Sequence, residues 1–167
     1  MSQKKTSASI PAIRLRPAAT ADMPRLITLI NSAFAVETFF EGPRIDSERL
    51  AALMARGRIL VAVDRRGRML ASVYMERRGA RGYLGMLAVD PARQGKGLGR
   101  HMVEAAENRF RRQRCEAADI TVLSLRPELP PIYRKLGYVE TGTEEFHPSV
   151  PLKPGIECHC IVMSKRL

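Results

Sequence analysis

The stretch Gln94–Gly99, "QGKGLG", constrains the fold of this chain more than any other segment. Residues 83–89 predict a strand that ends at Asp90-Pro91, and an amphipathic helix pattern begins at Leu98. Glycines between a strand and a helix allow a sharp turn and leave the first amide N–H groups of the helix uncovered. Because the positive end of the helix dipole lies behind that loop, the segment is suited to binding a phosphate group.

The spacing of these glycines departs from the two best-known phosphate-binding patterns. A Walker loop, G-x-x-x-x-G-K-[ST], is excluded because Gly97 follows Lys96. A dinucleotide fingerprint, G-x-G-x-x-G, is excluded because the glycines fall at positions 95, 97 and 99. From these residues alone, a phosphate cradle and a merely flexible turn are equally open.

The periodicity of the remaining chain predicts an α+β fold with a mixed central sheet flanked by helices, in the order β-α-α-β-β-β-α-β-α-β-β. The predicted strands are residues 13–16, 59–63, 69–77, 83–89, 120–125, 138–146 and 156–166, and the predicted helices are 20–34, 46–56, 98–113 and 130–136. Residues 12–167 are expected to form a single domain. Residues 1–11 have no apolar segment and are expected to be a flexible tail, not a secretory signal.

Composition limits the partners and the compartment. No apolar run approaches the roughly 20 residues that cross a bilayer, so no membrane partner is expected. The three cysteines are an odd number without disulfide spacing, which favours reduced thiols in a cytoplasmic protein. The three histidines, His101, His147 and His159, lack metal-ligand spacing, so no metal is expected.

The formal net charge of +11 does not by itself decide between ligands. The basic residues are scattered along the chain, and only 5% of residues are aromatic, which disfavours a nucleic-acid-binding stripe. A small polyanionic ligand fits this charge as well as a solvated surface does.

The segment "LAVDPARQGKGLGRHMVE" resembles the strand-to-helix core of the GCN5-related N-acetyltransferases (GNAT), whose signature is Q/R-x-x-G-x-G/A. Gln94, Gly97 and Gly99 occupy the signature positions. Downstream, "YRKLGYVETG" resembles the Y-x-x-x-G-[FY] segment of the same family through Tyr133, Gly137 and Tyr138, and the ending "IVMSKRL" is similar to M-x-K-x-L. The resemblance covers residues 12–167.

The resemblance implies that the co-substrate acetyl-CoA lies in a V-shaped opening between two central strands that part at a bulge. Main-chain groups of the strand would pair with the pantetheine arm, and amide N–H groups of the loop would surround the pyrophosphate. The strand residues are Leu87, Ala88 and Val89, and the loop residues are Gly95, Lys96, Gly97, Leu98, Gly99 and Arg100.

In such enzymes a neutral amine attacks the thioester carbonyl directly, and the departing thiolate needs a proton. The resemblance assigns the role of proton donor to Tyr133, because a phenol with a pKa of about 10 is protonated at neutral pH. The alternative is that Tyr133 is only a core aromatic residue. The general base stays open, because neither parted strand carries a carboxylate near the expected reaction centre. The candidates are Glu37, Glu41, Glu76 and the cluster Glu144, Glu145 and His147.

The acceptor is expected to be a small-molecule or peptide amine. The stretch 37–44, "ETFFEGPR", is expected to contribute an aromatic wall from Phe39 and Phe40 and a carboxylate from Glu41, which together suit an organic ammonium group. The alternative is a hydrophobic loop that packs onto the core or against a second subunit of a homodimer. Two other functions remain open: a catalytically idle acyl-CoA sensor and, third, a nucleic-acid-binding protein.

Overall fold

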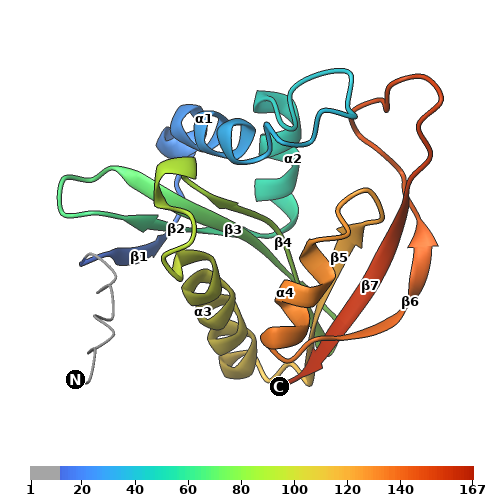
Figure 1. The fold of residues 1–167 in the computed structure, drawn as a ribbon. Helices are drawn as coiled ribbons and strands as arrows, with labels where there is room; N and C mark the ends of the chain where they lie inside the picture. Colours follow the sequence, from blue (N-terminus) through green and yellow to red (C-terminus); the bar gives the residue numbers. More distant parts are fainter. Residues whose placement is uncertain (1–11) are drawn as a thin grey trace, which may run out of the picture.

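The computed structural model describes residues 12–167, so the tail expected at residues 1–11 lies outside the described residues. Within them, one sheet has the strand order β1-β2-β3-β4-β5-β7-β6 (Figure 1). Neighbouring strands are antiparallel except β4 and β5, which are parallel. The strands are β1 (Arg14–Pro17), β2 (Arg58–Val63), β3 (Met69–Arg78), β4 (Arg81–Val89), β5 (Ala117–Leu123), β6 (Val139–Glu145) and β7 (His159–Arg166). The helices are α1 (Met23–Ala33), α2 (Ser47–Arg56), α3 (Leu98–Arg112) and α4 (Leu129–Lys135).

This order confirms the fold class and the element order predicted from the sequence. Two short 3-10 turns, Thr20–Asp22 and Pro91–Arg93, precede α1 and α3. The first of them occupies the turn at which the sequence predicted the start of the first α-helix. Across residues 12–167, every helix is too short or too polar to span a lipid bilayer.

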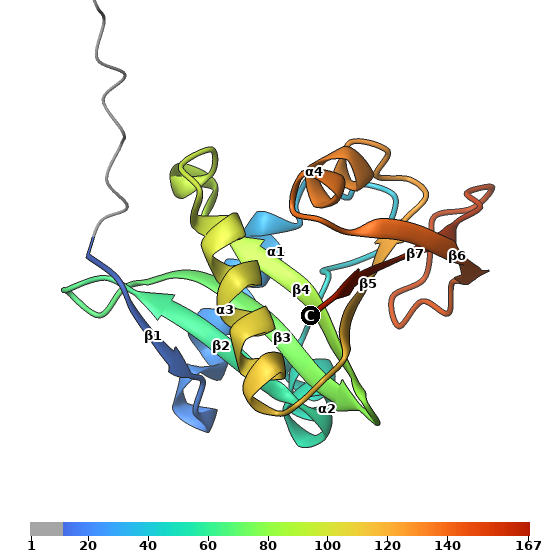
Figure 2. The same ribbon diagram turned by 90° about the horizontal axis from the view of Figure 1, so that it is seen from below.

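Helices cover both faces of the sheet and create two apolar cores. In Figure 2, α3 lies in front of the sheet, whereas α1 and α2 lie behind it. Behind the sheet, Leu26 and Leu50 from these helices are fully buried with the β2 residue Val61. In front, the α3 residues Met102 and Phe110 belong to a larger buried cluster that also takes side chains from β3, β4, β5 and β7. The alternation of side chains along each strand therefore divides them between two cores.

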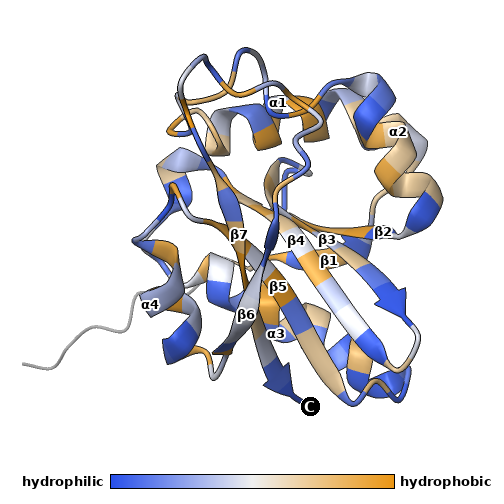
Figure 3. Ribbon diagram, turned by 90° about the vertical axis from the view of Figure 1, so that its right-hand side faces the viewer, coloured by the Kyte–Doolittle hydropathy of each residue, from blue (hydrophilic) through white to orange (hydrophobic). Residues whose placement is uncertain are grey.

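The half of the sheet beyond β4 is more polar. Helix α1 contacts β3 and β4, and α2 contacts β2, so this helical layer lies over the first half of the sheet. Every residue of β6 is exposed, and this strand is mostly blue to pale in Figure 3. On β5 and β7, the side chains that point away from α3 include Asp119, Thr121 and Ser164, which are only half-buried. A partly open, polar sheet face thus lies beside α1 and α2.

Candidate active site

Strands β4 and β5 part after only three residue pairs. They pair from Arg81 with Ala117 to Tyr83 with Asp119, and no later residue of β4 pairs with β5. The β3–β4 register shifts a few residues further along β4, so that Met86 and Leu87 lie opposite a single β3 residue. Met86 has a φ of 47°, which is rare for a residue with a side chain. Bulges of this kind end strand pairing and are frequent beside active sites. The main chain of β4 beyond Gly85, which includes Leu87, Ala88 and Val89, is therefore left without a β5 partner.

The glycine loop continues directly from this unpaired end of β4. Gly95 and Gly97 have φ angles of 76° and 82°, and a Cβ atom on either would meet nothing within 4 Å. Gly97 is the N-cap residue of α3, and the first helical bond joins the amide of His101 to its carbonyl at 3.0 Å. The amides of Leu98, Gly99 and Arg100 consequently have no helical acceptor. The loop offers a set of open N–H groups at the positive end of α3.

Side chains of the glycine loop and of its flanking residues add little to its capacity to bind an anion. Gln94 donates from Nε2 to the carbonyl of Val89 at 3.2 Å and so ties the loop back to the end of β4. Lys96 is exposed, and Arg100 pairs with Glu104 at 2.8 Å along its own helix. Exposed pairs of this type stabilise a protein by roughly 0–1 kcal/mol. The anion-binding capacity of the loop therefore lies mainly in its main chain.

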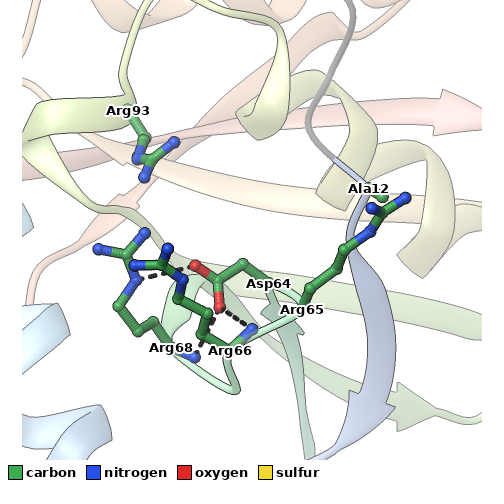
Figure 4. Close-up of a pocket in the computed structure, with 6 residues that line it drawn as sticks. All are labelled: Ala12, Asp64, Arg65, Arg66, Arg68 and Arg93. Carbon is green, nitrogen blue, oxygen red and sulfur yellow. Dashed lines mark hydrogen bonds and ion pairs between the residues drawn. The ribbon is translucent and has the colours of Figure 1, made fainter.

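A cluster of arginine side chains lies beside the turn between β2 and β3. Arg93, directly before the glycine loop, lines a cavity of about 400 Å³ together with Arg65, Arg66 and Arg68 (Figure 4). Asp64 accepts hydrogen bonds from the amides of Arg66 and Arg68, at 2.9 Å each, and from Nε of Arg68 at 2.8 Å. The carboxylate thus holds the turn in place, and the Arg93 side chain extends toward this turn.

Tyr133, on α4, packs against the core in front of the sheet. Its ring lies edge-on to that of Tyr138, with 6.0 Å between the centroids. Burial raises the pKa of Tyr133 to about 12, and the nearby Tyr83 adds to the rise while Arg126 opposes it. Among the hydrogen bonds of residues 12–167, none uses the Tyr133 hydroxyl. The side chain is therefore a protonated phenol whose O–H is available to a ligand.

A buried ion cluster joins the two loops that border the parted strands. Glu37, from the α1–α2 loop, accepts a hydrogen bond from Nη1 of Arg126 at 2.8 Å and lies 3.2 Å from Nε of Arg44. Its side chain is 4% exposed, and the two arginine side chains are 16–17% exposed. Burial raises the pKa of Glu37 despite both arginines, and burial lowers the pKa of Arg44. Glu37 is one of the candidate bases named from the sequence, but no sequence pattern pointed to either of its partners.

The α1–α2 loop also meets the loop before β7. The amide of Lys153 donates to the carbonyl of Phe39 at 2.9 Å, and the amide of Glu41 donates to the carbonyl of Pro151 at 2.8 Å. The stretch 37–44 and the loop before β7 are thus side by side. Phe40 is 5% exposed, lies 4.9 Å from the Phe39 ring and carries the guanidinium of Arg44 over its face at 4.8 Å. Glu41 is exposed and Phe39 is half-buried, so this trio presents a carboxylate and part of one aromatic ring to solvent.

The remaining candidate bases differ in their surroundings. Glu76 accepts hydrogen bonds from Tyr74 at 2.9 Å and Arg78 at 3.1 Å, which hold the pKa of its carboxyl below the usual value. Glu144 and Glu145 are exposed on β6. No group of three or more metal-ligating side chains occurs among the described residues.

Comparisons with known proteins identify the family. Residues 28–152 match the model of the acetyltransferase (GNAT) domain. The chain is 33% identical over 143 residues to glucosamine 6-phosphate N-acetyltransferase 1 of Oryza sativa subsp. japonica, an alignment that covers 80% of this chain and 85% of the rice protein. The chain therefore belongs to the GNAT acetyltransferases and is an acyltransferase.

Solved structures share the fold at low sequence identity. The ribosomal-protein-S18-alanine N-acetyltransferase from Escherichia coli superposes with a TM-score of 0.76 at 18% identity, over 93% of this chain and 94% of the other. A phosphinothricin acetyltransferase from Sinorhizobium meliloti in complex with AcCoA has a TM-score of 0.72 at 19% identity, over 93% and 88%. Structural neighbours of this chain thus include one that binds acetyl-CoA.

Proposed function

We propose that this enzyme transfers the acetyl group of acetyl-CoA to a primary amine by direct attack. The observation that carries the proposal is the continuity of two main-chain surfaces: the unpaired end of β4 and the open amides of the glycine loop. Main-chain groups of Leu87, Ala88 and Val89 would pair with the pantetheine arm as an added strand would. The amides of residues 95–100 would bind the pyrophosphate.

Tyr133 supplies the proton in this proposal. The amine nitrogen attacks the thioester carbonyl, the C–S bond breaks, and the thiolate of CoA takes the phenolic proton. The proton that the amine loses leaves to solvent, and solvent returns one to the phenolate, so acetyl-CoA and amine give amide and CoA thiol. A pKa of about 12 keeps Tyr133 protonated at neutral pH, and its free hydroxyl supports the role.

No strand carboxylate is assigned as the base. Asp119, the one carboxylate on β4 and β5, already accepts hydrogen bonds from Arg81 and Ser164. Glu37 is held by two arginines. The amine is therefore expected to lose its proton to water, and the rate should rise with pH as the neutral amine becomes the major form.

The test is release of CoA thiol from acetyl-CoA in the presence of a panel of amines. The panel contains glucosamine, glucosamine 6-phosphate because of the rice relative, an amino acid, a polyamine and a peptide with a free N-terminus. Turnover with at least one amine, lowered by Tyr133→Phe, is expected. Acetyl-CoA binding without turnover against any amine would instead identify an idle acyl-CoA sensor.

A further inference from the structure

A polar cavity of about 300 Å³ lies on the open sheet face, next to the point where β4 and β5 part. Residues of five strands, from β3 to β7, line it, and Val162 is the one lining residue without a polar side-chain group. Asp119, Thr121 and Ser164 reach it because they point away from the core under α3, to which their neighbours Ile120 and Met163 belong. We call this space the strand cavity.

The strand cavity adjoins the proposed reaction centre through Tyr83. This residue is the last in β4 to pair with β5, and its hydroxyl lies 3.1 Å from Oγ1 of Thr121. The Tyr83 phenol is also close enough to Tyr133 to raise its pKa. Tyr83 therefore links the cavity to the surroundings of the proposed proton donor.

Most charged side chains in the strand cavity form an ion pair with a side chain of opposite charge. Asp119 accepts two hydrogen bonds from Arg81, both at 2.6 Å, and one from Ser164 at 2.5 Å. Arg78 pairs with Glu76 at 3.1 Å and lies over the Tyr83 ring at 3.9 Å. Within residues 12–167, Glu144 is the lining carboxylate that has no ion pair.

Hydroxyl groups dominate the rest of the cavity wall. Thr141, exposed on β6, makes only long contacts, at 3.4 Å to the carbonyl of Val162 and 3.5 Å to Oγ of Ser164. Tyr83, Thr121 and Ser164 can each accept a further hydrogen bond. Hydroxyl lining combined with one uncompensated carboxylate is complementary to a molecule that has several hydroxyl groups and a positive charge.

We propose that the strand cavity binds the body of the acceptor, and that the acceptor is a hydroxylated amine of the amino-sugar or amino-alcohol class. This inference rests on the proposed function and adds the substrate class to it. The hydroxyl groups of the acceptor bond Thr121, Thr141 and Ser164, and Glu144 attracts its ammonium form. The amine then faces the parted strands after it loses its proton.

The experiment compares glucosamine with cyclohexylamine, a ring amine without hydroxyl groups, as acceptors for wild type and matched variants. Thr141→Val removes a cavity hydroxyl, and Glu144→Gln removes the charge. Thr143→Val is the control, because Thr143 lies on the same strand and pairs with Ile161, which packs against the core on the other face. The fold of each variant is checked through its melting temperature with and without acetyl-CoA.

In wild type, kcat/KM is expected to be at least about tenfold higher for glucosamine, as two or more hydrogen bonds would provide. Thr141→Val should lower kcat/KM for glucosamine about 3- to 10-fold and leave cyclohexylamine and the KM for acetyl-CoA unchanged. Glu144→Gln should raise KM for both amines, and Thr143→Val should change nothing. Equal use of both amines by wild type, or equal losses in Thr141→Val and Thr143→Val, would overturn the inference and leave the proposed function intact.

A binding measurement keeps the inference testable if no amine supports turnover. Glucosamine is titrated calorimetrically into the CoA-saturated protein, which requires no transfer. Binding that weakens in Thr141→Val but not in Thr143→Val would support the strand cavity as the amine site, even though the proposed reaction had failed. Absence of binding to wild type would overturn the inference.

Discussion

The two sides of the parted strands are built from different parts of the chain. On the side proposed for acetyl-CoA, the available groups are main-chain groups: the unpaired end of β4 and the amides of the glycine loop. On the side proposed for the acceptor, they are side chains that come from loops and from five strands. The first side depends on where the backbone runs, whereas the second depends on which side chains the fold brings together.

The two sides should therefore respond to substitution in different ways. A main-chain site is damaged by a residue that changes backbone conformation or covers the amides, whereas removal of nearby charges has little effect. A side-chain site responds to single polar atoms. It can also change its ligand without any change in the backbone, as expected when one fold serves several substrates.

The largest effect is expected at Gly97. Valine at a φ of 82° is strained by roughly 1–2 kcal/mol and also covers the loop amides. Acetyl-CoA at a hundredfold excess over Kd should stabilise wild type by about 2.7 kcal/mol, or a Tm rise of roughly 5–10 °C. Gly97→Val should show no such rise in a thermal melt.

Gly67→Val is the matched control for that experiment. Gly67 also has a left-handed φ, 77°, and open space around its Cβ position, but it lies in the β2–β3 turn. Both variants should lose similar stability, and only Gly67→Val should keep the acetyl-CoA response. A normal response of a folded Gly97→Val would remove the amides from the proposed cofactor site.

The second prediction concerns Tyr133→Phe. No hydrogen bond among residues 12–167 depends on this hydroxyl, so stability and acetyl-CoA affinity should be unchanged. Loss of the proton donor should lower kcat about 10- to 1000-fold. Because the pKa of Tyr133 is raised to about 12, the wild-type rate should lose this acid only as the pH approaches that value.

Tyr138→Phe should show the opposite behaviour. Tyr138 donates to the buried Glu107 at 2.9 Å, and its loss should destabilise the fold by about 1–2 kcal/mol with little change in kcat. Urea unfolding and initial rates measured on both variants separate the two roles. Equal kcat in Tyr133→Phe and wild type would reduce Tyr133 to a packing residue.

The backbone geometry of the side proposed for acetyl-CoA could be predicted from the sequence, because its determinants are local. Gly95, Gly97 and Gly137 have positive φ angles, as a loop, a helix start and a helix end require. Other glycines are required because residues far away in the sequence approach them closely, which no local pattern shows. Gly82 falls between the predicted strands 69–77 and 83–89 but lies within β4, where a Cβ would come within 2.4 Å of the Phe110 ring. Gly57 directly follows α2 with an extended φ of −142°, and a Cβ there would lie 2.4 Å from the carbonyl oxygen of Met75.

The side proposed for the acceptor, which is built from side chains, could not be predicted in this way. Glu37 and Arg126 are 89 residues apart, and Tyr83 and Thr121 are 38 apart. Each pair forms only because the sheet order brings β4, β5 and the flanking loops together. Glu37 and Glu41 are four residues apart, a spacing that would bring them to one side only if α1 extended through them. The helix ends at Ala33, and the two carboxylates lie in different environments, one buried and one exposed.

The third prediction tests the buried cluster on the acceptor side. Glu37→Gln keeps the shape of the side chain but leaves Arg44 and Arg126 without their shared negative charge. Loss of one partner of a fully buried pair costs about 3–5 kcal/mol, and the partial exposure of both arginines reduces the expected loss to roughly 1–3 kcal/mol. Urea unfolding measures it. Because the cluster joins the loops on the acceptor side, the Tm shift caused by acetyl-CoA should persist, whereas its loss would show that the two sides are coupled.

The smallest effect is expected at the exposed end of the α1–α2 loop. Glu41 has no ion pair among the described residues, so Glu41→Gln should leave stability unchanged. If its carboxylate helps to attract the acceptor ammonium group, KM for the amine should rise about 2- to 5-fold, as loss of an exposed ionic contact allows, while KM for acetyl-CoA stays constant. Phe39→Leu should raise the same KM by removing the half-exposed aromatic face, whereas the buried Phe40 is expected to act through loop stability. Sedimentation of both variants completes the test: a changed oligomeric mass with unchanged amine kinetics would make this stretch a subunit contact, and the acceptor side would then consist of the strand cavity alone.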